Sequence, residues 1–352
     1  MKNSNLYQED IKSVLNLNCD FSKLQEKTIL IAGATGLIGS VLVDMLIFLS
    51  KTYKLDLNLI LISRTAENYS EKFEDTFIQH IKCDVANENL TEKIPLDKKI
   101  DFIFHLASNT HPADYAKYPI ETILTNFNGT KELLDISSKN LPCRFIFASS
   151  VEVYGDDKEK LSDGFKELDF GYLDCNTMRA CYNESKRISE TLCQAYKAEK
   201  NCDVVIARIA RSYGATLKKN DTKALSQFLR CGLNNENVIL KSRGEQFFSY
   251  IYSLDVACAL IFLMLNGENG EAYNVADKNS NIQLKDLANL VAQNCNVKVD
   301  FDIPDETEKA GYSKSVRAIL NPSKINSLGW TAQVGIEDGV ERMIKILAGV
   351  WQ

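Results

Sequence analysis

The stretch TILIAGATGLIGSVLVDML, residues 28–46, decides the fold. Thr28–Ala32 predicts a buried strand, and the apolar residues that follow the last glycine recur at helical spacing. Gly33, Gly36 and Gly39 join the two, where glycine permits a tight turn and lets the backbone approach a pyrophosphate at the helix N-terminus. A glycine-rich turn without a ligand is the alternative. Because strand, spacing and helix agree, the stretch favours a dinucleotide site.

Outward from this stretch, apolar strands and helical patterns alternate as far as residue 209. Further strands are expected at 57–62, 78–83, 100–106, 144–148 and 204–209, and helices at 39–49, 120–139 and 179–199. Continuous apolar strands separated by helices are typical of a parallel sheet covered on both faces. We therefore predict an α/β fold: a doubly wound parallel-sheet (Rossmann) domain with a smaller mixed α/β substrate domain.

The pattern changes after about Gly214, where short strands and helices mix. Strands are expected at 238–240 and 247–252, and helices at 222–233, 255–265, 284–293 and 337–347. We expect a helical extension over 1–26, with an apolar face of Ile11, Val14, Leu15 and Leu17, and a dinucleotide-binding domain over 27–213 to which 249–277 returns. A substrate-binding domain over 214–248 and 278–352 would complete a cleft at the carboxyl ends of the strands.

The composition excludes several classes of function. The net charge of -6 argues against nucleic acid or an anionic membrane as the main partner. No apolar run approaches the roughly 18 residues of a membrane span, and the opening MKNSNLYQED lacks the basic and apolar parts of a signal peptide. The 10 cysteines are scattered, without CxxC spacing or a histidine at metal-ligand distance. We expect reduced, mostly buried thiols, no metal, and a cytoplasmic protein.

A second motif, Tyr182-Asn-Glu-Ser-Lys186, places a phenol and an amine one helical turn apart on the same face. A phenol is a poor base at neutral pH unless a cation stabilises its anion, because its reference pKa is about 10. Lys186, together with a positive nicotinamide, would supply that field, and Tyr182 could then take a proton from a substrate hydroxyl as hydride leaves. A surface pair of the same spacing is common. A catalytic role is favoured because the motif follows the strand that carries Ser149 and Ser150, in a chain that opens with the glycine turn.

The third motif is FASSVEVYG, residues 147–155, at the carboxyl end of a buried strand. Active sites of doubly wound sheets assemble at that edge. Ser150 could hydrogen-bond the reacting hydroxyl, and Glu152 could act as an acid or base. As alternatives, the serines would cap the loop and Glu152 would be a solvated side chain. Both residues follow closely on the end of the predicted strand, where they would face the cleft. This position favours a role in the reaction for Ser150 and, by a smaller margin, for Glu152.

With these motifs the chain resembles the extended short-chain dehydrogenase/reductases of the NAD-dependent epimerase/dehydratase family, which act mainly on nucleotide sugars. The similarity runs from Lys27 to the C-terminus. It is strongest locally to the UDP-glucuronate decarboxylase branch, in HLASNTHPADYAKYPIETILTNFNGT (105–130), SSVEVYGD (149–156), RACYNESKR (179–187) and the Leu-Gly-Trp of 328–330.

The resemblance implies roles for individual residues. The catalytic set would be Ser150, Glu152, Tyr182 and Lys186, since Glu152 matches a glutamate of the dehydratase and decarboxylase branches. Substrate would be bound by Asn109, Arg211, Phe248 and Arg317. The cofactor would be bound by Gly33, Thr35, Gly36, Leu37, Ile38, Gly39, Ser63, Arg64, Asp84, Val85, Leu106, Ala107, Ser108, Asn126 and Lys186.

Several positions depart from the family pattern. The acidic residue expected after the second strand is Ser63, followed by Arg64, which could pair with the 2′-phosphate of NADP or stack on adenine with NAD. The dehydratase aspartate is Val151. A substrate-loop asparagine is Arg211, and the usual diphosphate-binding arginine is Phe248. The cofactor is thus expected to be NAD(P), with a preference for NADP. Arg211 is expected to hold the substrate phosphates, and a surface arginine paired with a nearby carboxylate is the alternative.

These observations predict an NAD(P)-dependent nucleotide-sugar epimerase or dehydratase that acts through a transient 4-keto sugar. Decarboxylation is less favoured, because Phe248 replaces the arginine of that branch. A net NADP-dependent sugar oxidoreductase and a catalytically idle NADP-binding regulatory protein are the alternatives, and the Ser150, Tyr182 and Lys186 set argues against the second. We expect a nucleotide-sugar or related sugar-phosphate substrate, and a homodimer formed through the helices at 120–139 and 179–199.

Overall fold

An eight-stranded sheet forms the centre of the molecule. The computed structural model describes residues 2, 4–65, 69–73, 75–86, 89–94, 99–110, 117–157, 161–303 and 316–351. The strand order is β11-β7-β6-β5-β1-β2-β4-β3, and every neighbouring pair is parallel except β3 with β4. The strands are β1 (Thr28–Ala32), β2 (Leu57–Ser63), β3 (Tyr69–Phe73), β4 (Thr76–Lys82), β5 (Phe102–His105), β6 (Arg144–Ser150), β7 (Asp203–Ile209) and β11 (Ala272–Val275).

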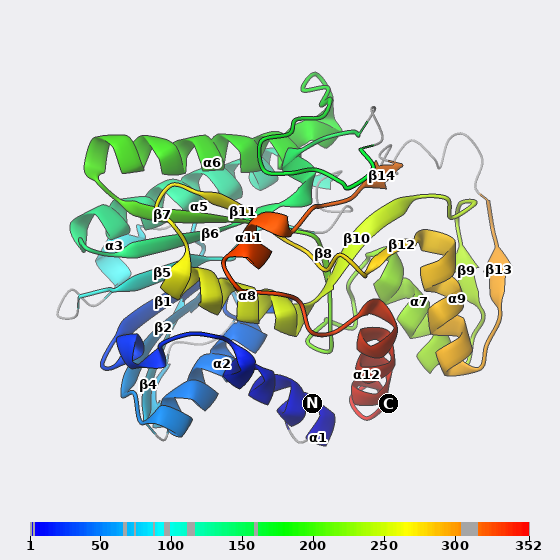
Figure 1. Cartoon of the computed structure of the whole chain (residues 1–352), viewed down its shortest axis with the longest axis horizontal. Helices are drawn as coiled ribbons and strands as arrows, with labels where there is room; N and C mark the ends of the chain where they lie inside the picture. The colour runs from blue at the N-terminus through cyan, green and yellow to red at the C-terminus, as the bar shows by residue number, and fades with distance from the viewer. Residues whose placement is uncertain are drawn as a thin grey trace.

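Helices cover both faces of this sheet, as Figure 1 shows. On one face α2 (Leu37–Tyr53) packs beside α8 (Ser253–Asn266), and on the other α5 (Pro119–Lys139) packs beside α6 (Cys181–Lys200). The central strands are buried on both sides, so their sequences are apolar without alternation. The predicted doubly wound parallel sheet is therefore confirmed.

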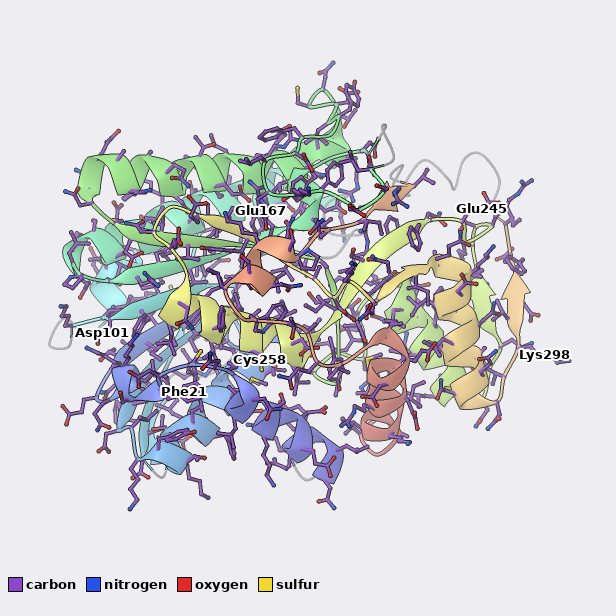
Figure 2. The ribbon with its side chains drawn as sticks, in the orientation of Figure 1. Phe21, Asp101, Glu167, Glu245, Cys258 and Lys298 are labelled. Carbon is purple, nitrogen blue, oxygen red and sulfur yellow. The ribbon has the colours of Figure 1, made fainter. Side chains whose placement is uncertain are left out.

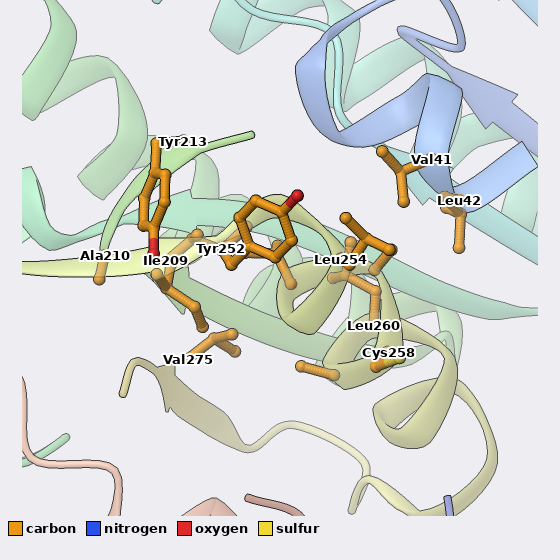
Figure 3. Close-up of a cluster of buried hydrophobic side chains, with 14 of the residues drawn as sticks. Val41, Leu42, Ile209, Ala210, Tyr213, Tyr252, Leu254, Cys258, Leu260 and Val275 are labelled. Atoms are coloured by element: carbon orange, nitrogen blue, oxygen red, sulfur yellow. The ribbon is translucent and has the colours of Figure 1, made fainter. Parts of the chain in front are cut away.

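The core under α8 joins the large sheet to the rest of the molecule. Side chains fill the space around Cys258 (Figure 2). Figure 3 shows Val41 and Leu42 of α2 facing Leu254 of α8, with Tyr252 beside Leu254 and Tyr213 beyond it. Because this apolar cluster is continuous, the second part of the chain is packed directly onto the first.

The smaller part holds a second sheet at the carboxyl edge of the first. Its strands are β8 (Arg211–Tyr213), β10 (Phe247–Tyr252), β12 (Asn281–Gln283) and β14 (Arg317–Ala318), while β9 (Val238–Leu240) pairs with β13 (Val299–Phe301). Figure 1 shows α7 (Ala224–Leu233), α9 (Leu284–Cys295) and α12 (Ile336–Ala348) around these strands, away from the large sheet. β11 returns to the large sheet beside β7, whereas β8 and β10 pair with each other. The domain division made from the sequence stays a prediction.

The N-terminal segment lies on the large domain and reaches α12. Asp10 of α1 (Asn5–Lys12) is buried, accepts a hydrogen bond from Tyr252 Oη at 3.0 Å and pairs with Arg342 of α12 at 2.9 Å. Burial raises the pKa of Asp10 to about 6. The segment is therefore fixed by polar contacts as well as by its apolar face. Leu15, expected on that face, is 39% exposed, because the chain tightens into a 3-10 turn at Ser13–Asn16 and rotates it outward.

Other expectations from the composition can also be compared with the fold. All 10 cysteines are free thiols and six of them are buried. The described part of the chain holds no cluster of side chains suited to a metal ion. Within the same residues, no helix is long and apolar enough to cross a membrane.

Candidate active site

The glycine turn between β1 and α2 lies at the carboxyl edge of the sheet. It is at the switch point of the strand order, with β2 on one side of β1 and β5 on the other. Gly33 has a φ of +91°, and a Cβ there would lie 2.7 Å from the backbone N of Ala107. A Cβ on Gly39 would overlap the carbonyl oxygen of Gly33. Packing therefore requires these two glycines. Gly36, the N-cap of α2, lines an open pocket, and its missing Cβ leaves room for a ligand at the helix N-terminus.

That pocket contains most of the predicted cofactor residues, which come from four separate strand ends. The predicted residues that line it are Gly33, Thr35, Gly36, Leu37, Ser63, Arg64, Asp84, Val85, Leu106, Ala107, Ser108 and Asn109. Ile38, Gly39, Asn126 and Lys186 lie outside its lining. An elongated pocket that crosses the switch point of a doubly wound sheet suits a dinucleotide. The residues present fit the cofactor that the glycine turn predicts.

The far end of the pocket holds the residues expected to select the cofactor. Ser63 Oγ is hydrogen-bonded to His80 Nε2 at 2.9 Å and is buried. Arg64 is half exposed, donates to Asn109 Oδ1 at 3.3 Å and lies 3.6 Å from a carboxylate oxygen of Glu121. The guanidinium is thus held at the rim by weak contacts that a phosphate could replace.

The pocket has a wall that sequence reasoning missed. The loop after β8 crosses the glycine turn, and Thr216 Oγ1 donates to the carbonyl oxygen of Leu37 at 2.6 Å. This loop contributes two cations, Lys218 and Lys223, to the pocket lining, together with Asp221. Lys223 lies 3.9 Å from Asp221, and burial lowers its pKa. The two lysines are almost 200 positions after the glycines, and no local pattern marks their proximity.

The catalytic pair lies on α6 beside the end of β6. Tyr182 is in the first turn of the helix, whose positive end favours a phenolate. Its phenol is buried, which raises the pKa to about 12, against the lowering effect of hydrogen bonds with Ser150 and Ser108. Lys186, one turn later, is 2% exposed and donates to the carbonyl oxygen of Ala148 at 2.8 Å. Burial lowers the pKa of Lys186 to about 7. The predicted serine, tyrosine and lysine are therefore brought together.

Asn126 of α5 connects two parts of the site through side-chain hydrogen bonds. Its side chain accepts a hydrogen bond from Ser108 Oγ at 2.7 Å and donates to Ser185 Oγ at 2.8 Å. It is fully buried, and it links the loop after β5 to the catalytic helix α6. Asn126 thus fixes Ser108 and the helix that carries Tyr182, rather than lining the pocket.

A buried ion pair braces the same helix against the sheet. Glu190, one turn after Lys186, pairs with Arg208 of β7 at 2.7 Å and accepts a hydrogen bond from Ser149 Oγ. Arg208 also donates to Tyr154 Oη at 3.0 Å. The charge of Glu190 opposes the effect of burial on Lys186, so this network supports the cationic form of that lysine.

Glu152 lies in the turn Val151–Val153 that directly follows β6. Its Oε1 accepts a hydrogen bond from Arg211 Nη2 at 3.2 Å, and its Oε2 accepts one from Asn183 Nδ2 at 3.2 Å. Arg179 Nη2 lies 3.7 Å from Oε2. The carboxylate is close enough to Tyr182 for its charge to raise the pKa of that phenol. The contacts of Asn183 and Arg179 with the Glu152 carboxylate were not predicted from the sequence.

The remaining predicted substrate residues lie on the second sheet. Phe248 is buried, and the guanidinium of Arg211 lies over its ring. Arg317 of β14 pairs with Asp157 at 3.2 Å and lies over the ring of Phe247, its neighbour on β10. The two arginines are therefore held by different carboxylates.

This arrangement can move one proton and hold a hydroxyl. Ser150 and Tyr182 can both hydrogen-bond a substrate oxygen, and the ammonium of Lys186 stabilises the phenolate that results when Tyr182 gives its proton up. Glu152 lies a few residues further along the same edge of the sheet and could exchange a proton with a neighbouring carbon.

Comparison with known proteins agrees with this geometry. The model of a family described as "NAD dependent epimerase/dehydratase family" matches residues 29–276. UDP-glucuronic acid decarboxylase 3 of Arabidopsis thaliana is 30% identical over 318 residues, which is 90% of this chain and 87% of the relative. UDP-glucuronic acid decarboxylase 1 of Danio rerio is 28% identical over 327 residues, 92% of this chain and 73% of the relative.

Solved structures share the fold. UDP-glucose 4-epimerase of Thermotoga maritima superposes with a TM-score of 0.76 at 22% identity, over 92% of this chain and 100% of that one. dTDP-glucose 4,6-dehydratase of Bacillus anthracis, solved with NAD, gives a TM-score of 0.74 at 18% identity, over 92% and 97% of the two chains.

Proposed function

The chain belongs to the NAD-dependent epimerase/dehydratase family, and on that premise we propose that it converts a nucleotide sugar through a transient 4-keto intermediate. The observation that carries the proposal is the convergence of Ser150, Tyr182 and Lys186 at the carboxyl edge of β6, next to the dinucleotide pocket. Relatives named UDP-glucuronic acid decarboxylase support a UDP-linked sugar as the substrate.

In this mechanism the protein supplies the proton transfers. A nicotinamide bound in the dinucleotide pocket would supply an acceptor, and later a donor, for the hydride at C4 of the sugar. Tyr182, as phenolate, takes the proton of the C4 hydroxyl while Ser150 holds that oxygen, and Lys186 stabilises the phenolate. The ketone makes the hydrogen on C5 acidic, and the carboxylate of Glu152 is the group that we assign to it. Asn126 keeps the loop and the helix that carry these groups in register.

The fate of the ketone decides the overall reaction. If Glu152 removes the C5 proton, the outcome is dehydration or epimerisation at C5. If the ketone is presented again on its other face, hydride return gives epimerisation at C4 without C5 chemistry. With a uronic acid, loss of CO2 leaves its electron pair on C5, which then takes a proton from solvent. We favour chemistry at C5, because Glu152 is fixed beside Tyr182 by two hydrogen bonds and by the nearby guanidinium of Arg179.

Solvent deuterium is expected to identify this chemistry. UDP-glucose, UDP-glucuronate, UDP-N-acetylglucosamine and dTDP-glucose would be incubated with enzyme and either NAD or NADP in D2O, and the products analysed by mass spectrometry. Deuterium at C5 is expected in the product, and Glu152→Gln should reduce product formation and exchange by roughly the 10²–10⁴-fold typical of a lost general base.

Other results would redirect the proposal. Product without deuterium would indicate a 4-epimerase and leave Glu152 without a role in proton transfer. Release of CO2 from UDP-glucuronate would identify a decarboxylase. Turnover that consumes NAD(P) in proportion to product would identify a net oxidoreductase.

For the cofactor we propose a preference for NADP, supported by Arg64 at the pocket rim and by the absence of an acidic side chain at Ser63. Arg64→Ala is expected to weaken NADP about tenfold or more and to change NAD binding little, because a charge-assisted contact to phosphate is worth about 1.5–3 kcal/mol. Calorimetric titration of both cofactors measures the difference. Tighter binding of NAD than NADP by the unmodified enzyme would contradict the preference.

We further propose a homodimer, formed through α5 and α6, in the cytoplasm. Ile120, Ile123 and Leu124 of α5 and Ile188 of α6 are all more than 40% exposed on that face, and a pair of helices with apolar outer faces is suited to self-association. A monomer mass in sedimentation equilibrium would reject the dimer.

A further inference from the structure

The two positions at which the second sheet departs from the family pattern, Arg211 and Phe248, are in direct contact. The guanidinium carbon of Arg211 lies 3.6 Å from the centroid of the Phe248 ring. β8 and β10 are parallel, with Arg211 opposite Tyr250, and Phe248 is two residues from Tyr250 on the same face of the strand. A flat cation thus rests on an aromatic face, which limits the rotamers available to the arginine.

The same arginine reaches across to the catalytic edge of the large sheet. Its Nη2 donates to Glu152 Oε1 at 3.2 Å, while Asn183 of α6 donates to Oε2 at 3.2 Å. Each oxygen of the carboxylate is therefore held from a different element, one by β8 of the second sheet and one by helix α6. A glutamate side chain has three rotatable bonds, and it keeps one orientation only when both oxygens are held in this way.

The position of the guanidinium is poorly suited to a diphosphate. One face is covered by Phe248, and Nη2 is engaged by Glu152. Nη1 is enclosed by protein and has no hydrogen-bond partner among the described residues, so it does not present a donor to the cleft. Arg211 is also absent from the lining of the dinucleotide pocket.

We infer that Arg211, held on Phe248, is a positioning residue that aims Glu152 at the sugar, rather than a clamp for the substrate phosphates. This inference rests on the proposed function, in which Glu152 acts at the ketone stage. The inference gives Phe248 a role as well, because its ring holds the guanidinium of Arg211 in position without contacting the substrate.

Loss of the positioning contact is expected to change kcat and not KM, because a displaced Glu152 slows the proton transfer without changing the binding of the substrate. A misplacement of about 1 Å can lower a rate about 10²-fold. Arg211→Met keeps the unbranched stem and removes the charge, and is expected to lower kcat about 10- to 100-fold with KM changed less than about threefold. Oxidation at C4 precedes the affected step, so reduced cofactor should accumulate, visible by its absorbance during turnover.

Phe248→Leu tests the stacking separately. Leucine keeps an apolar side chain but lacks a ring face, so kcat should fall in the same direction by a smaller factor. Arg211→Lys keeps the charge and should recover part of the lost rate. Arg144→Met is the matched control: Arg144 pairs with Asp203 at 2.8 Å at the opposite end of β6, and its loss should leave kcat and KM within about twofold.

The measurements use the full chain with NAD(P) and the sugar nucleotide that it turns over, with UDP as a competitive probe of phosphate binding and a thermal melt to check folding. A tenfold rise in the inhibition constant of UDP with kcat unchanged would overturn the inference and give Arg211 the phosphate role. Unchanged kcat, KM and deuterium exchange in Arg211→Met would overturn it as well. If the wild-type enzyme makes product without exchange at C5, the proposed role of Glu152 fails first, and the positioning role with it.

Discussion

Replacing Tyr182 by phenylalanine is expected to lower turnover by roughly 10²–10⁴-fold, the cost of removing a general acid–base group. The ring of Tyr182 is buried in the first turn of α6, and phenylalanine has the same shape, so the fold should be unchanged. The hydrogen-bonded hydroxyl is the only group lost. Cofactor affinity should also be nearly unchanged, because the phenol lies beside Ser150 and not in the dinucleotide pocket.

The measurement is steady-state turnover together with a cofactor titration on the same preparation. Ser185→Ala is unsuitable as a control, because Ser185 is bonded to Asn126. An exposed tyrosine, Tyr53 of α2, provides the matched control, and Tyr53→Phe should leave both quantities unaltered. Near-normal turnover in Tyr182→Phe would reject Tyr182 as the acid–base group, whereas no turnover by the unmodified protein would favour the catalytically idle, NADP-binding alternative.

Replacing Lys186 by methionine is expected to abolish most activity and yet to raise stability at neutral pH. Lys186 is buried with its ammonium against a single carbonyl oxygen, that of Ala148. The titratable groups around it are Tyr182, Glu190 and Cys193 on α6 and His105 on β5, of which only Glu190 is charged at neutral pH. Without the cation, the phenolate of Tyr182 loses its stabilising charge, so turnover should fall at least as far as in Tyr182→Phe. Cofactor binding is expected to weaken as well, because the family resemblance implies that Lys186 also contacts the cofactor.

The effect on stability follows from the pKa of Lys186, which burial lowers from 10.5 to about 7. The unfolded chain holds this proton more tightly than the folded one, so the lysine destabilises the fold. The cost is fully present below about pH 7 and is relieved as the pH rises toward 10.5, because the unfolded state then loses its advantage in bound protons. Methionine removes this cost, which is on the order of a few kcal/mol, against about 1 kcal/mol for the lost hydrogen bond.

Thermal or denaturant unfolding at several pH values tests this. The stability gain of Lys186→Met over the wild type should be largest at pH 6–7 and should shrink progressively up to about pH 10. A gain in stability that does not depend on pH, or a loss of stability at pH 7, would contradict this prediction. It would show that the charge of Glu190 and the hydrogen bond to Ala148 offset the desolvation of the buried ammonium.

Much of the fold followed from short-range patterns. The apolar strands, the helices between them and the parallel sheet were predicted, because burial on both faces imposes continuous apolar runs. The short strands were not: β3, β8, β11, β12, β13 and β14 have two to five residues and are only partly apolar, so nothing in their own sequences marks them. They form because neighbouring strands offer unpaired backbone groups. The domain boundaries stay predictions for the same reason, since β8 and β10 join sheets according to long-range pairing.

The sequence by itself determined the dinucleotide turn and the Tyr182–Lys186 pair, because each depends on contacts within one or two helical turns or within a single strand-to-helix connection. Only the tertiary structure decided where the isolated charges act. It placed Lys218 and Lys223 in the lining of the pocket that the glycine turn also lines, and it turned Arg211 toward Glu152 with its guanidinium over the ring of Phe248. An arginine in a sequence carries no signal for its partner, because a long flexible side chain takes its orientation from the charges and ring faces that packing brings within about 4 Å of it.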